Sequence, residues 1–237
     1  MHIYKHLDAE RLLDTIGTWT KIDKTIREII YGREQELNMW VHHSYNIQFV
    51  MWNILNIMIE HGYAEFDYNN ILDIVVASAL HDIGKLLVPT WILNKPGALT
   101  GNERKLVNLH VKIGVDIIDT LFTGFNNHNI FKISKELAEF HHENWDGSGY
   151  LKGLVGEEIP LLARVCSIAD TYAALVENRP YKESIWHDEA VKIIGNCSGG
   201  KFDPLITELF VSNSRNTSIE TYKGLSFIEV LMQHIKG

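Results

Sequence analysis

One apolar run that ends in ionisable residues constrains the fold more than any other feature of this chain. Residues 71–80 are apolar almost throughout, and they run directly into His-Asp-Ile-Gly-Lys at residues 81–85. A segment that is apolar all round belongs in the centre of a helical core. Burying an imidazole and a carboxylate there is costly unless each has a partner. A hydrogen bond between His81 and Asp82 would satisfy both groups, and a metal ion that binds both would do the same.

Helical periodicity extends along the whole chain. The apolar run predicts a helix over 71–84, and at its end His81 and Lys85 would share a face because they are four residues apart. Thr100 and Glu103 form a capping box at the start of another helix. No alternating strand pattern of useful length occurs, so we predict an all-α fold. The other predicted helices cover residues 1–32 (as one helix or two), 34–61, 100–121, 130–142, 160–177, 183–196 and 204–211.

Length and composition are those of one large soluble globular domain, with or without an N-terminal extension. The 237 residues are 46% hydrophobic and 22% charged, and 30 acidic against 22 basic residues give a net charge of −8. This balance argues against a general DNA- or RNA-binding protein, which would carry a basic face. No apolar run reaches the ~20 residues that span a bilayer. We expect residues 1–35 to form a helical extension that packs on the domain or builds a homodimer, and residues 36–237 to form the main domain.

The cysteines and histidines indicate which chemistry is available. Cys166 and Cys197 have no partner at the spacing of a metal site, so we expect reduced thiols and a cytoplasmic protein. The chain has 12 histidines, and two adjacent pairs occur at residues 42–43 and 141–142. Histidine is therefore the residue type from which a metal site would be built.

Histidines and carboxylates from five predicted helices form the candidate ligand set. His43 lies one turn before Ile47 on an apolar face, and Asp170 lies in an apolar helix where a carboxylate needs a partner or a cation. Imidazoles with carboxylates and without thiolates suit Fe, Mn or Zn. Seven ligands exceed what one ion takes and suit two ions that share a carboxylate. The candidates are His43, His81, Asp82, His110, His141, His142 and Asp170.

Several ordered motifs resemble those of the HD-GYP family of HD-superfamily phosphohydrolases. The resemblance covers residues 40–212 and implies an all-α HD-superfamily bundle around a buried metal centre. It also implies hydrolysis of cyclic di-GMP to the linear dinucleotide pGpG, often with further cleavage to GMP. The motifs are HDIGK at 81–85, a downstream His at 110, HHENWDGSGY at 141–150, IADTY at 168–172 and RPYK at 179–182.

The resemblance also implies the metal ligands. Fe or Mn suits such a centre best, with Zn, Ni or Mg as alternatives. Two ions ~3.5–4 Å apart can hold a bridging hydroxide that attacks the phosphate. Three-metal members place a Glu one turn before the first His, where this chain has Met39, so we predict two ions. One ion would bind His43, His81, Asp82 and Asp170, and Asp82 would bridge to a second ion held by His110, His141 and His142.

The remaining site residues are expected to act on the substrate. Lys85 lies next to the ligands and would stabilise the charge that develops on the phosphate, so catalysis is assigned to Lys85 and Asp82. Arg179 and Lys182 would clamp phosphate oxygens, and Tyr150 would stack on a guanine. Lys85, Tyr150, Arg179 and Lys182 are therefore the predicted substrate contacts.

Two departures from the family pattern leave alternatives open. Leu151 stands where the family has Pro, which predicts a less rigid loop, and Ala173 replaces an Asp. Both support a catalytically weak module that binds a cyclic dinucleotide and acts through a signalling-protein partner. The substrate could also be 3′,3′-cyclic GMP-AMP, which some members hydrolyse, or another nucleotide. The predicted ligands and Lys85 are all present, which favours an active phosphodiesterase.

Overall fold

The computed structural model describes residues 9–29, 34–68, 70–125, 129–177 and 184–216, together with Phe227 and Glu229. Within these ranges the fold is all-α, as predicted, and two isolated bridges are its only β-structure. The α-helices are α1 (Ala9–Ile29), α2 (Glu34–Glu60), α3 (Asn70–Ser78), α4 (Thr90–Leu93), α5 (Gly101–Asn108), α6 (His110–Leu121), α7 (Asn129–Phe140), α8 (Leu161–Val176), α9 (His187–Asn196) and α10 (Pro204–Ser212). The 3₁₀ helices in these ranges are η2 (Ile83–Leu87), η3 (Thr123–Phe125), η4 (Gly156–Glu158) and η5 (Ser214–Asn216).

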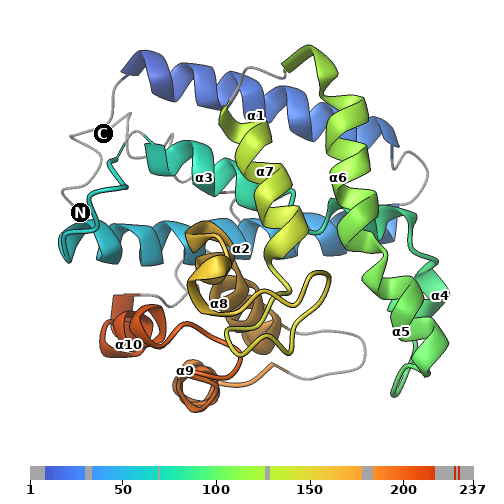
Figure 1. Cartoon of the computed structure of the whole chain (residues 1–237). Coiled ribbons are helices and arrows are strands. Elements are labelled where there is room, and N and C mark those ends of the chain that lie inside the picture. The colour runs from blue at the N-terminus through green and yellow to red at the C-terminus, as the bar shows by residue number, and fades with distance from the viewer. Residues whose placement is uncertain are drawn as a thin grey trace.

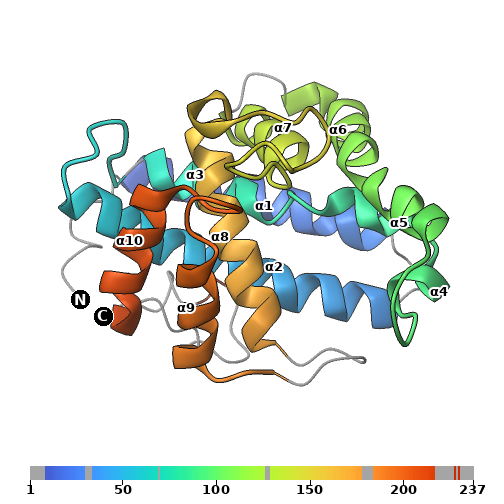
Figure 2. The same cartoon turned by 60° about the horizontal axis from the view of Figure 1, so that its bottom comes forward.

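Helices α2 and α3 form the centre of the bundle. In Figure 1, α2 runs across the molecule, with α3 and α1 on one side and α8, α9 and α10 on the other. Helix α3 packs against α1, α2 and α7, and α2 also packs against α8. Figure 2 shows α9 beside both α8 and α10. Every residue of α3 from Ile71 to Ser78 is buried, as expected for a run that is apolar all round.

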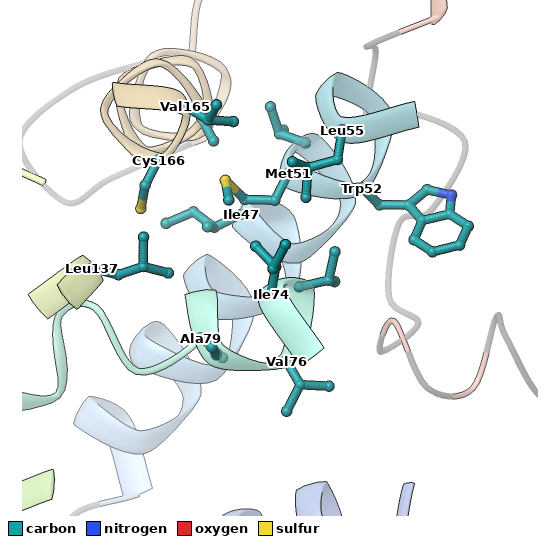
Figure 3. Packing of buried hydrophobic residues seen from close by; sticks show 14 of the residues in the cluster. Ile47, Met51, Trp52, Leu55, Ile74, Val76, Ala79, Leu137, Val165 and Cys166 are labelled. Atoms are coloured by element: carbon teal, nitrogen blue, oxygen red, sulfur yellow. The ribbon is translucent and has the colours of Figure 1, made fainter. Parts of the chain in front are cut away.

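An apolar layer fixes the helices that carry the candidate ligands (Figure 3). Ile47, Met51 and Leu55 recur every four residues along α2 and are fully buried. Burying each such side chain stabilises the fold by ~1.5–3 kcal/mol. This layer therefore holds α2, which carries His43, against α8, which carries Asp170. The same cluster includes Ile74 of α3, Leu137 of α7, and Val165 and Cys166 of α8.

The N-terminal helix packs on the rest of the chain. Trp19, Ile22 and Ile26 of α1 are buried in the core, and the hydroxyl of Thr15 donates a hydrogen bond of 3.3 Å to Asp73 of α3. Packing on the domain was one of the two roles expected for this segment, while dimerisation and the division at residue 35 stay predictions. No helix in the described ranges is long and apolar enough to cross a membrane.

The helix predicted over 71–84 ends earlier, at Ser78, so this prediction was wrong at its C-terminal end. The next three backbone N–H groups bond to carbonyls three residues back, which is the tighter 3₁₀ pattern. His81 and Asp82 consequently lie in a turn before η2. Lys85 bonds to Asp82, three residues back, and does not share an α-helical face with His81.

The helix predicted over 100–121 is two helices. The predicted capping box is present, with both reciprocal bonds between Thr100 and Glu103. Helix α6 then begins afresh at His110, so this residue starts a helix and does not lie in the middle of one. The carbonyl of Val107, near the end of α5, accepts a hydrogen bond of 2.7 Å from Nδ1 of His110. The interruption between α5 and α6 thus places and orients His110, a candidate ligand.

Candidate metal centre

The structure brings all seven candidate ligands together at one place in the bundle. They come from the middle of α2, the turn after α3, the start of α6, the end of α7 and the middle of α8. They form two groups, and within each group the candidate ligand atoms all lie within 4.8 Å of one another. Asp82 belongs to both. The first group is Asp82, His110, His141 and His142, and the second is His43, His81, Asp82 and Asp170.

Asp82 lies between the two groups and directs one carboxylate oxygen to each. Its Oδ1 is 3.1 Å from Nε2 of His110 and 3.6 Å from Nε2 of His141. Its Oδ2 is 3.3 Å from Nε2 of His81 and accepts a hydrogen bond from the ammonium group of Lys85. Burial alone would raise the pKa of this carboxyl group, but the adjacent positive charge of Lys85, together with the neighbouring imidazoles, holds its pKa well below the ordinary value. Asp82 is therefore a carboxylate at neutral pH.

Backbone carbonyls orient three of the histidines. The Nδ1 atoms of His81, His110 and His141 lie 2.8, 2.7 and 2.8 Å from carbonyl oxygens three or four residues upstream. A carbonyl can only accept, so each Nδ1 carries the hydrogen, and the neutral form of each ring then presents a lone pair at Nε2. In the described part of the chain, these Nε2 atoms, that of His142 and Oδ1 of Asp82 are buried without a hydrogen-bond partner. Lone pairs that converge in this way fit a bound metal cation.

Protonation of all the imidazoles would be the alternative to a cation, and the packing of the rings disfavours it. The ring centroids of His141 and His142 are 4.0 Å apart, and those of His110 and His142 are 5.0 Å apart. Burial and the neighbouring His141 place the pKa of His142 well below its ordinary value. His142 therefore stays neutral and keeps a lone pair available.

His43 is held between two carboxylates. Its Nε2 lies 3.2 Å from Oδ1 of Asp170, and its Nδ1 lies 3.0 and 3.2 Å from the two oxygens of Glu177. Burial lowers the pKa of His43, but the hydrogen bonds to Asp170 and Glu177 outweigh it and raise the pKa to about 9. Sequence reasoning missed Glu177. The available signal was a carboxylate one turn beyond Ala173 at the end of an apolar helix.

Gly84 allows η2 to approach α6 closely. A Cβ atom at this position would lie 1.9 Å from the carbonyl oxygen of His110 and 2.6 Å from the backbone nitrogen of Gly114. Such contacts are sterically impossible, so any side chain here would force η2 and α6 apart. The glycine of the HDIGK motif therefore keeps Asp82 next to His110.

Tyr150 lies at the edge of the centre. Its ring stacks on that of His142, with centroids 4.8 Å apart and planes inclined by 24°, and its backbone N–H bonds to the carbonyl of His142. Burial, with the nearby Asp82 and Asp170, raises the pKa of its hydroxyl group, which keeps it protonated. Because His142 covers one face of the ring, a nucleobase could stack only on the other.

The loop that contains Leu151 is tied to a buried carboxylate. Glu143 is 2% exposed and accepts hydrogen bonds from the backbone N–H groups of Leu151, Lys152 and Leu154, at 2.8, 2.6 and 3.1 Å. Proline has no N–H group, so the first of these bonds exists only because the chain departs from the family pattern. Sequence reasoning did not assign a role to Glu143. Two further predicted substrate contacts, Arg179 and Lys182, lie outside the described residues.

Comparison with known proteins identifies the family. The HD domain model matches residues 62–206, more than half of the chain. A cyclic di-GMP phosphodiesterase of Vibrio cholerae serotype O1 is 40% identical over 136 residues, which are 57% of this chain and 28% of that protein. A cyclic di-GMP phosphodiesterase of Thermotoga maritima is 39% identical over 141 residues, 60% of this chain and 37% of that protein.

A relative with a different substrate matches equally well. The 3′3′-cGAMP-specific phosphodiesterase 2 of Vibrio cholerae is 38% identical over 138 residues, 58% of this chain and 25% of that protein. This chain thus covers only 25% to 37% of the length of these three relatives. The matched region includes the HDIGK motif, the second histidine pair and the Asp170 helix. The chain belongs to the HD domain family and is related to the HD-GYP cyclic di-GMP phosphodiesterases.

Proposed function

We propose that this chain is a metal-dependent phosphodiesterase that hydrolyses cyclic di-GMP to pGpG, with further cleavage to GMP. One observation carries the proposal: two four-residue ligand groups share the carboxylate of Asp82, and four buried Nε2 atoms around it lack hydrogen-bond partners in the described part of the chain. The three relatives described above are named as phosphodiesterases of cyclic dinucleotides, which supports the same reaction class.

The ligand groups suit a pair of divalent ions, with Fe or Mn as the proposed identity. Each group offers nitrogen and oxygen donors without sulfur, as these metals prefer. Bound ions of this kind lower the pKa of a water molecule toward ~7 and neutralise the charge of a phosphate group. The chain's part is to hold the donors rigidly, and the backbone bonds to three Nδ1 atoms do so. Asp82 is the proposed shared ligand.

Lys85 is the proposed group that stabilises the transition state. Its ammonium bonds to Oδ2 of Asp82, and its side chain is 29% exposed, so it lies at the accessible edge of the centre. A fixed positive charge beside the phosphate stabilises the charge that develops during attack. Tyr150 is the proposed base-stacking residue, and Arg179 with Lys182 are the proposed phosphate contacts, on the strength of their place in the sequence.

A second candidate substrate is 3′,3′-cyclic GMP-AMP. The observation that favours it is the relative specific for this dinucleotide, which is 38% identical, against 40% and 39% for the two relatives named for cyclic di-GMP. The reaction at the phosphate would be the same for both molecules. They differ in one base, so groups that contact the bases would decide between them.

The test is a product assay with anaerobically prepared protein that has been loaded with Mn²⁺ or Fe²⁺. Cyclic di-GMP and 3′,3′-cyclic GMP-AMP are incubated separately, and linear products are separated by anion-exchange chromatography. We expect pGpG from the first substrate. His43→Ala should abolish cleavage, whereas His42→Ala should not, because His42 is exposed beside the centre. If the protein binds two ions but forms no linear product, the result would instead favour a signalling module that binds cyclic dinucleotides without cleaving them.

A further inference from the structure

Among the carboxylates of the described residues, Glu177 is the one shown to contact Nδ1 of His43. It follows the last residue of α8, and its backbone N–H bonds to the carbonyl of Ala173 at 3.0 Å, so it caps the C-terminal end of the helix. Its carboxylate oxygens lie 3.0 and 3.2 Å from Nδ1 of His43. The side-chain amide of Asn46 donates a further bond of 2.7 Å to Oε1. The carboxylate is thereby held in place on the rear of the His43 ring.

This arrangement differs from that of the other histidines for a physical reason. His81, His110 and His141 lie at or beyond helix ends and use nearby backbone carbonyls to bind their Nδ1 hydrogen. His43 lies within the continuous helix α2, whose carbonyls are taken by its own N–H groups. A partner for Nδ1 of His43 must therefore come from another element, and α8 supplies it through Glu177.

We propose that Glu177 is a positioning residue for the candidate metal centre. It accepts the Nδ1 hydrogen of His43 and fixes the ring, so that Nε2 faces Asp170 and would bind a cation that displaces its proton. A carboxylate behind a metal-binding imidazole also makes that imidazole a stronger donor, and losing such a partner typically costs 10–100-fold in metal affinity. The inference rests on the proposed metal centre and assigns it a residue that the HD-GYP resemblance does not imply.

The sequence of α8 fits this role. Ala173 is fully buried and stands where the resemblance implies an aspartate, so a carboxylate is missing from this turn of the helix. Glu177 lies four residues further on and returns a carboxylate to the same side of α8. Its side chain is 15% exposed, which shields its bond to His43 from water. The departure at Ala173 is thus accompanied by a carboxylate that reaches the centre from the next turn.

The test is a titration of metal-free protein with Co²⁺, in which binding is measured by calorimetry and by visible absorption. Glu177→Gln removes the charge, and Glu177→Ala removes the partner altogether. Glu208→Gln is the matched control, because Glu208 is an exposed carboxylate on α10. We expect two binding steps in the wild type and the control. One step should weaken about tenfold in the Gln variant and up to about 100-fold in the Ala variant, while the other step stays unchanged.

The outcomes separate this inference from the proposed function. If the wild type does not bind two ions, the proposed metal centre fails. If the wild type binds two ions and both Glu177 variants titrate like it, only the role of Glu177 fails. Equal weakening of both steps would also overturn that role, because it would show a general effect on the fold. A second measurement repeats the titration in a His142→Ala background, in which only the group that contains His43 keeps all four of its ligands. The Glu177 substitutions should still weaken the binding of the ion held by that group.

Discussion

Replacing Leu151 by proline, the residue of the family pattern, should destabilise this protein. The backbone N–H of Leu151 donates a bond of 2.8 Å to the buried carboxylate of Glu143, and proline cannot make it. Glu143 would keep its bonds from Lys152 and Leu154, so the carboxylate would lose one of three donors. The substitution therefore tests whether the hydrogen bond from Leu151 to Glu143 takes the place of the conformational restriction that proline would provide.

The expected loss follows from two opposing terms. A hydrogen bond to a charged group contributes about 1.5–3 kcal/mol. Proline offsets about 0.4–1 kcal/mol of this by restricting the unfolded chain. The net loss is about 0.5–2.6 kcal/mol, which lowers the melting temperature of a chain of this size by roughly 1–10 °C.

The assay is thermal and urea denaturation of metal-free protein, followed by circular dichroism, for Leu151→Pro and Leu151→Ala. The alanine variant is the matched control, because it keeps the N–H group and removes a side chain that is 52% exposed. Its stability should lie within about 0.5 kcal/mol of the wild type. A proline variant at least as stable as the alanine variant would refute the reasoning.

Other perturbations test the centre and the surface. Asp82→Asn should remove both ions together, measured by metal analysis, because both ligand groups share its carboxylate. Lys85→Ala should keep two ions and lose about 10²–10³-fold in turnover; loss of metal would contradict its role. Chelation should lower the melting temperature, and Mn²⁺ at 100 times its Kd should restore about 2.7 kcal/mol. Bonds from Lys95 and Thr100 lower the pKa of Glu103 from 4.5 to about 2, so its contribution to stability is complete above pH 4.5 and disappears as pH falls through 2. The melting temperatures of the wild type and Glu103→Gln should therefore converge in that window, and a constant difference would contradict this.

Local patterns were sufficient to predict most of the fold. The extents of α2 and α8, and the capping box of α5, follow from apolar spacing and end signals, because these helices obey local rules. The breaks at Ser78 and before His110 could not be read in this way. There, histidine side chains bind backbone carbonyls that would otherwise serve the ladder, and this competition depends on tertiary contacts.

Some residues of the candidate site could likewise be predicted from the sequence, and others could not. The order of the motifs was sufficient to identify all seven predicted ligands, and the structure brings them together. Metal binding itself stays a proposal. Glu143 and Glu177 could not be assigned, since each acts through a partner that is remote in sequence or through backbone groups. A carboxylate that supports another residue has no pattern of its own in one sequence.

The missing side chain at Gly84 also limits how this centre can change. Because even one methyl group there would collide with the carbonyl of His110, η2 and α6 can cross this closely only while residue 84 has no side chain. Mutation can vary the loops and charges around the rim, where the proposed substrate contacts lie. Any larger residue at this position would move η2 away from α6, so an engineer who replaces this glycine would also change the spacing of the two proposed ion sites.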